Sequence, residues 1–219
     1  EHFHEVKDIH LKELFKNNPN RQNDLQIDFK DFHVDFSKNR ITKKTLNLLV
    51  DLANEVDLKD AIKQYFSGEK INETEKRAVL HTALRDFSEE EIFVDDIAIK
   101  PAIKSTLDKI QSFSDNVISG KWKGFTGKSI TDIVNVGIGG SDLGPDMVVT
   151  TLKHYKNHLN THFVSNIDGD HVSEILKELN PETTLFIVVS KTFTTQETLT
   201  NANTIQQWFL HTASEKDIA

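Results

Sequence analysis

The sequence has 219 residues, of which 37% are hydrophobic and 27% charged, with a formal net charge of −8 and no cysteine. The absence of cysteine excludes disulfides, thiolate catalysis and cysteine-ligated zinc, and the acidic balance argues against nucleic acid or an anionic membrane surface as the main partner. The apolar runs are too short to span a bilayer and the charged start does not resemble a signal peptide, so the cytoplasm is the expected location.

Residues 1–118 are predicted to form a mainly helical N-terminal segment with a small β-hairpin. Apolar residues recur at three- and four-residue spacings, which is typical of helices, in residues 6–15, 46–58 and 78–84. Apolar and polar residues instead alternate on both sides of Lys30-Asp31, which predicts the hairpin.

Two punctuation signals divide this segment further. Ser67-Gly68 is predicted to end one helix, because glycine readily adopts the backbone conformation that follows a helix. Asn72-Glu-Thr-Glu75 is interpreted as the start signal of the next helix.

Residues 119–219 are predicted to form the first part of an α/β domain, entered through a glycine-rich connector from Gly120 to Gly127. Strands are expected at 130–138, 162–166 and 185–189, followed by helices at about 145–158, 171–179 and 196–212. This rhythm implies right-handed crossovers and a parallel sheet with helices on both faces. Three such strands leave an unpaired edge, so we interpret the sequence as part of a longer chain.

The first candidate loop is Gly137-Ile-Gly-Gly-Ser-Asp-Leu-Gly-Pro145, between a predicted strand and a predicted helix. Glycines let backbone N–H groups approach a ligand closely, and the helix start adds partial positive charge. A plain strand-to-helix turn is the alternative. Nucleotide motifs fail here, because a dinucleotide fingerprint needs glycine where Asp142 stands and a Walker A loop needs Lys-Ser/Thr where Pro145-Asp146 stands.

The second candidate loop follows the third predicted strand and combines hydroxyls with one lysine, in Ser190-Lys-Thr-Phe-Thr-Thr-Gln-Glu197. In open α/β sheets both loops lie outside the carboxyl ends of the strands, so they face the same side. Hydroxyls, helix N–H groups and a lysine describe a phosphate cradle. Capping of the next helix by Thr194 with Glu197 is the alternative. No arginine follows Arg85, which makes Lys191 the expected positive charge.

Other candidate sites are interpreted as structural. His154, His158 and His162 are expected on an exposed polar face rather than at a metal. Asp168-Gly-Asp170 is expected to form a turn, because the rest of a calcium loop is missing.

Both loops resemble motifs of the glucose-6-phosphate isomerase family. The matching residues are Gly137 to Pro145 and Ser190 to Thr198. Further stretches are similar in the same order, namely 37–41, 68–72, 77–85 and 120–124. The resemblance runs from about residue 8 to the end of the sequence.

The resemblance implies a three-layer αβα sandwich of the sugar isomerase type, in a cytoplasmic homodimer that needs no metal or organic cofactor. It implies interconversion of D-glucose 6-phosphate and D-fructose 6-phosphate by ring opening and proton transfer through a cis-enediol. The residues implied to bind the substrate phosphate are Ser190, Lys191, Thr192, Thr194 and Thr195. Gly140 and Ser141 are implied to lie against the sugar.

The resemblance places no catalytic residue in this chain. The family uses a glutamate base, and its later motifs, built around Gly-Arg-Phe/Tyr-Ser/Thr and Gln-x-Gly-Val-Glu, have no match here. Glu197 fits the start of a helix and is not taken as that base. The isolated chain is therefore expected to be inactive. A non-catalytic regulatory module of the same fold is the alternative, less favoured because the N-terminal segment and the Gly139–Asp142 loop both match the enzyme.

Overall fold

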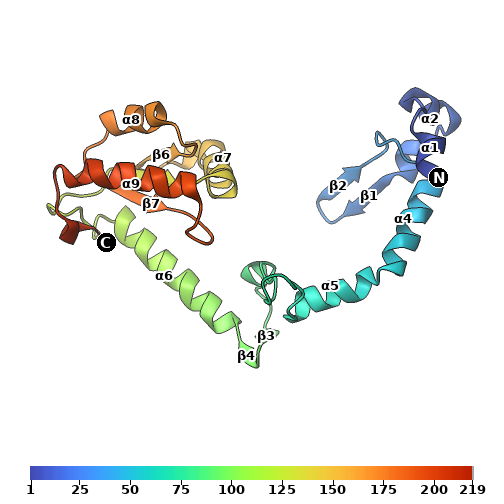
Figure 1. The fold of residues 1–219 in the computed structure, drawn as a ribbon, viewed down its shortest axis with the longest axis horizontal. Coiled ribbons are helices and arrows are strands. Elements are labelled where there is room, and N and C mark those ends of the chain that lie inside the picture. The colour runs from blue at the N-terminus through green and yellow to red at the C-terminus, as the bar shows by residue number, and fades with distance from the viewer. Residues whose placement is uncertain (219) are drawn as a thin grey trace. The chain divides into compact units, whose positions relative to one another are not determined.

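The structure is a computed structural model that describes residues 1–218. Its contacts divide the chain into two compact units, one of Glu1–Ile103 and one from Lys104 onward, and each is described by itself (Figure 1). The boundary predicted between residues 118 and 119 stays a prediction. No helix among the described residues is long and apolar enough to cross a membrane.

The first unit is built from short helices and two small hairpins. Its helices are α1 (His2–Val6), α2 (Leu11–Asn17), α3 (Arg21–Asp24), α4 (Lys43–Glu55), α5 (Leu58–Ser67) and the 3-10 turn η1 (Ala83–Arg85). Its strands are β1 (Gln26–Phe29), β2 (Phe32–Asp35), β3 (Phe93–Val94) and β4 (Ile97–Ala98). The hairpin predicted around Lys30-Asp31 is confirmed, because β1 pairs antiparallel with β2 and Lys30 has a positive φ of 53°.

Arg21 anchors the loop that follows this hairpin. Its side chain is buried, with Nε donating to the carbonyl of Ser37 at 2.8 Å and Nη2 to that of Asn39 at 2.6 Å. The guanidinium also lies 5.6 Å from the ring centroid of Phe15. A buried charge is tolerated when its donors are satisfied, so these contacts hold the loop against the helices.

Two of the helical predictions in this unit hold only in part. Residues 6–15 do not form one helix, because His10 is extended and its Nδ1 accepts from the N–H of Lys12, which starts α2. Residues 46–58 are interrupted at Asp57, whose left-handed backbone (φ 51°) separates α4 from α5. The predicted helix end at Ser67-Gly68 is confirmed, with Gly68 at φ 92° after the last residue of α5.

The helix predicted at residues 78–84 is wrong apart from the 3-10 turn. The Asn72 side chain accepts from the Thr74 hydroxyl at 2.9 Å and the Glu75 N–H at 3.0 Å, as it would at a helix start. However, Asn72 also pairs with Arg77 in an isolated antiparallel bridge, and Lys76 has a positive φ of 55°. The start signal therefore closes a turn instead of opening a helix.

The second unit contains a parallel sheet whose strands alternate with helices, as predicted. Its helices are α6 (Lys100–Ile118), which begins just before the unit boundary, α7 (Leu143–Thr151), α8 (Gly169–Lys177) and α9 (Gln196–Leu210). Its strands are β5 (Asp132–Val136), β6 (Asn160–Val164) and β7 (Thr184–Val188), in the order β6-β5-β7. Short 3-10 turns are η2 (Gly139–Ser141), η3 (Lys153–Tyr155) and η4 (Glu215–Asp217).

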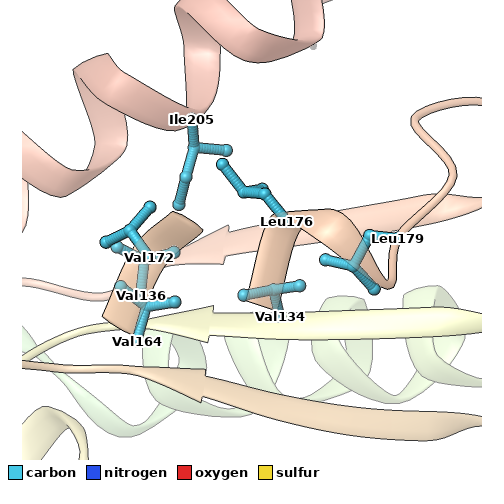
Figure 2. Close-up of a cluster of buried hydrophobic side chains, with 7 residues drawn as sticks. All are labelled: Val134, Val136, Val164, Val172, Leu176, Leu179 and Ile205. Atoms are coloured by element: carbon cyan, nitrogen blue, oxygen red, sulfur yellow. The ribbon is translucent and has the colours of Figure 1, made fainter. Parts of the chain in front are cut away.

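One face of the sheet carries the main core, which is covered by α8 and α9. Figure 2 shows Val134, Val136 and Val164 of the sheet facing side chains from the helices. Val172 and Leu176 come from α8 and Ile205 from α9, at spacings that put apolar residues on one side of each helix.

The opposite face is flanked by α6 and α7 and is only partly covered. Val117 of α6 packs with Ile130 and Leu159 in a second core, where Ile133 and Leu185 of the sheet also lie. An open apolar groove lies between α6 and α7. Ile187 of β7 is exposed in it, and Ile133 of β5 and Phe163 of β6 also line it. Helices on both faces of a parallel sheet make the predicted αβα sandwich.

Candidate functional site

The carboxyl ends of the three strands meet at one edge of the sheet. Val136 is in register with Val164 on one side and Val188 on the other. The Gly137 N–H donates to the Val164 carbonyl at 3.0 Å, and the Val189 N–H donates to the Val136 carbonyl at 2.8 Å. Neighbouring strands lie about 5 Å apart, so the glycine-rich and hydroxyl-rich loops leave the sheet side by side.

The glycine-rich loop forms the 3-10 turn η2 and then enters α7. Gly139 has a φ of 59°, which favours glycine, and Ser141 and Asp142 donate backbone hydrogen bonds to Ile138 and Gly139. The N–H groups of Gly139 and Gly140 donate to no other residue that the structure describes. Free N–H groups just before a helix start are suited to an anionic or hydroxylated ligand.

Ser141 is held directly over the end of β5. A Cβ added at Gly137 would lie 2.8 Å from both the Cβ and the carbonyl oxygen of Ser141, so only glycine allows this approach. The Asn135 side chain donates from Nδ2 to the Ser141 carbonyl at 2.9 Å. Asn135 is not among the residues predicted from the sequence. The signal that could have found it is a polar residue between two buried valines near the carboxyl end of the strand.

Asp142 is the least satisfied polar side chain of this loop. It is buried, and its Oδ1 has no hydrogen-bond partner among residues 1–218. It occupies the N-cap position of α7 but makes no side-chain cap hydrogen bond. Burial of an unpaired carboxylate oxygen is unfavourable, so the Asp142 side chain destabilises the folded loop in this arrangement.

The hydroxyl-rich loop is folded around contacts between its own hydroxyls. Ser190 Oγ accepts from the N–H of Phe193 at 3.1 Å and lies 3.3 Å from the Thr195 hydroxyl. The hydroxyls of Thr192 and Thr194 lie 2.7 Å apart. The predicted phosphate-binding hydroxyls therefore form two contacting pairs in the loop before α9, and these contacts help to shape the loop.

The capping interpretation of this loop is not what the structure forms. The N-cap of α9 is Thr195, one residue later than the capping pattern requires, and it makes no side-chain cap hydrogen bond. Lys191 is exposed and forms no ion pair with any described residue. The loop thus presents one unpaired ammonium group and the open N-terminus of a long helix, both of which attract an anion.

The amino ends of the strands hold a separate polar cluster. Asp132 accepts from the Thr131 hydroxyl at 2.7 Å and from Asn160 Nδ2 at 3.2 Å, and its Oδ1 lies 3.0 Å from His162 Nε2. Burial raises the pKa of Asp132, but these hydrogen bonds and the charge of His162 outweigh burial, so the pKa lies below its ordinary value of 3.8. His162 is therefore partnered inside the sheet, not exposed as predicted.

Comparison with known proteins gives the same relationship by sequence and by structure. The family model described as phosphoglucose isomerase matches residues 35–219. A curated glucose-6-phosphate isomerase from Christiangramia forsetii is 54% identical over all 219 residues. A solved glucose-6-phosphate isomerase from Chlamydia trachomatis aligns with 93% of the chain at a TM-score of 0.74 and 27% identity.

The coverage of these relatives is unequal in the two directions. The chain spans 40% of the length of the Christiangramia forsetii protein and 39% of the Chlamydia trachomatis chain. Both relatives carry the name glucose-6-phosphate isomerase.

Proposed function

The chain belongs to the phosphoglucose isomerase family, and from this membership we propose that it supplies the sugar-phosphate-binding part of an aldose-ketose isomerase. The reaction is the interconversion of D-glucose 6-phosphate and D-fructose 6-phosphate, as the family resemblance implies, and both relatives carry the name glucose-6-phosphate isomerase. The proposed enzyme is a cytoplasmic homodimer of glycolysis and gluconeogenesis that works without a metal or an organic cofactor.

The substrate phosphate binds at the hydroxyl-rich loop before α9. Lys191 provides the charge, and the helix N–H groups provide directed donors. The hydroxyls that complete the cradle are Ser190, Thr192, Thr194 and Thr195. Because these hydroxyls already contact one another in pairs, little side-chain freedom is lost when the phosphate binds.

The sugar lies against Gly140 and Ser141 at the neighbouring loop. The free N–H groups of the glycine turn can donate to sugar oxygens, and the Ser141 hydroxyl can donate or accept. Holding the phosphate at one loop and the sugar at the other fixes the position of C1 and C2. Such positioning lowers the entropic part of the barrier to proton transfer.

The proton itself is moved by a base outside these residues. General acid–base catalysis needs that base within hydrogen-bond reach of the carbon acid, and the family motif that carries the glutamate has no match in this sequence. The contribution of this chain is therefore to bind and orient the substrate.

The observation that carries this proposal is the register of β5 with β7, which starts both loops from adjacent strand ends. We would titrate the chain with inorganic phosphate and with fructose 6-phosphate, following NMR signals of Ser190 to Thr195. A Lys191→Ala variant is expected to bind both about tenfold or more weakly, because a charged hydrogen bond is lost.

The matched control is Lys109→Ala, which removes the same charge from an exposed position on α6. It is expected to bind both ligands like the unaltered chain. Equal affinity of the Lys191→Ala variant and the unaltered chain would overturn the assignment of the phosphate cradle.

A further inference from the structure

Asn135 is a polar residue in the central strand of the sheet, β5. Central strands of parallel sheets commonly read as apolar runs, yet the half-buried Asn135 stands fourth in Asp132-Ile-Val-Asn-Val136, between two fully buried valines. Its neighbours in the register are Phe163 on β6 and Ile187 on β7. A polar amide among such neighbours is unfavourable unless its hydrogen bonds are made.

The hydrogen bond that Asn135 makes is directed at the glycine turn. Its Nδ2 donates to the backbone carbonyl of Ser141 at 2.9 Å. The first backbone bond of α7 runs from the Asp146 N–H to the Asp142 carbonyl. The Ser141 carbonyl lies one residue before that ladder, so the helix does not provide its donor and Asn135 does.

A second, independent contact holds the same residue. Gly137 lies so close to Ser141 that an added Cβ would come within 2.8 Å of its carbonyl oxygen. Ser141 is therefore held by two contacts: it packs closely against Gly137, and its carbonyl accepts a hydrogen bond from Asn135 on β5. Within the turn, the N–H groups of Gly139 and Gly140 donate no hydrogen bond to any of the residues described.

We propose that Asn135 is a positioning residue for sugar recognition, holding the Gly139–Ser141 turn in the shape that meets the sugar. The proposal rests on the proposed function, because it assigns Asn135 to the sugar side of that site. Asn135 contacts the turn by its hydrogen bond to Ser141, and the proposal assigns it no role in the phosphate loop.

The test is Asn135→Leu in the full chain, which keeps the branched shape of the side chain and removes the amide donor. Inorganic phosphate is expected to bind unchanged, because the hydroxyl-rich loop is intact. Fructose 6-phosphate is expected to bind about three- to tenfold more weakly, as befits one lost hydrogen bond. Amide hydrogen exchange at Ser141 and Asp142, whose N–H groups are hydrogen-bonded within the turn, is expected to rise about tenfold or more as local opening becomes easier.

The matched control is Thr184→Val, which also removes one side-chain hydrogen bond to a backbone carbonyl. Thr184 is buried at the amino end of β7, and its hydroxyl donates to the Asn180 carbonyl at 2.8 Å. This variant is expected to lose stability while leaving the affinity ratio of the two ligands and the amide exchange at Ser141 and Asp142 unchanged.

The outcomes separate this inference from the proposed function. An Asn135→Leu variant with unaltered turn exchange and unaltered fructose 6-phosphate affinity would overturn the positioning role, and so would equal losses for both ligands. If the unaltered chain binds neither ligand, the proposed function fails, and the exchange rates still decide whether Asn135 holds the turn. Should Asn135→Leu fail to fold, Asn135→Asp, which also lacks the donor, is judged by the same criteria.

Discussion

Asp132 shows how a single carboxylate can tie two strands of this sheet together. It lies on β5 and bonds to Asn160 and His162 on β6, with side-chain exposures of 18% for Asp132 and 22% for His162. Its ionised form is stabilised in the folded chain, as its lowered pKa indicates. A depressed folded pKa contributes stability that is present above the unfolded value and is lost as the pH falls through the folded value.

We therefore predict that Asp132→Asn destabilises the chain at neutral pH, and that its deficit shrinks below about pH 4, where the unfolded carboxyl takes up its proton. Urea midpoints at pH 7, 5, 4 and 3 would measure this. Asp108→Asn, which removes a charge from the exposed surface of α6, is the control. A deficit that stays constant down to pH 3 would contradict the role given to the ionised form.

The residues of the site divide by how visible they are in the sequence. Glycines, hydroxyls and Lys191 cluster in two short runs, so composition alone marks them as candidates for a phosphate. Asn135 stands by itself in the sequence, and its role depends on a turn that folds back from Ser141. Lone polar residues in strands gain their meaning from tertiary contacts, which no local pattern contains.

At the scale of elements, the order of strands and helices in the α/β half could be predicted from the spacing of its apolar residues. Strand β5 places the buried Val134 and Val136 at alternate positions, and α8 places Val172, Ile175 and Leu176 on one side at helical spacing. The N-terminal half was harder, because its elements end through local backbone features. Asp57 and Lys76, both with positive φ, interrupt or redirect segments whose apolar spacing is still helical.

Helix α8 offers the clearest test of how an element is held. Leu176 is 9% exposed and packs in the cluster that joins α8 to the sheet. We predict that Leu176→Ala costs about 2–5 kcal/mol of unfolding free energy, since it removes buried methyl groups and leaves a cavity. Chemical denaturation followed by circular dichroism would measure the loss.

Ser173→Ala is the matched control on the same helix, because Ser173 is exposed. Its effect is expected to stay within about 0.5 kcal/mol. Similar losses for the two variants would mean that α8 is not held to the sheet by its buried side.

At the scale of the whole molecule, the chain contains the proposed substrate-binding loops but no proposed catalytic base. Both loops proposed for the substrate lie in this chain, at the carboxyl edge of one sheet. The chain nevertheless spans 40% of the length of its curated relative, and our proposal assigns the catalytic base to none of its residues. The substrate class came from the resemblance of the two loops, since charge and composition alone only excluded other classes.

We predict that the 219-residue chain binds sugar phosphate without isomerising it. Proton abstraction from carbon is slow without a placed base, and positioning alone does not supply one. The chain would be purified from a host lacking its own glucose-6-phosphate isomerase and assayed for exchange of the C2 proton of glucose 6-phosphate with solvent. The complete Christiangramia forsetii isomerase serves as the positive control. Exchange at an enzyme-like rate that disappears in Lys191→Ala would show that a base lies within this chain, and Glu197, at the start of α9, would then be the first residue to substitute.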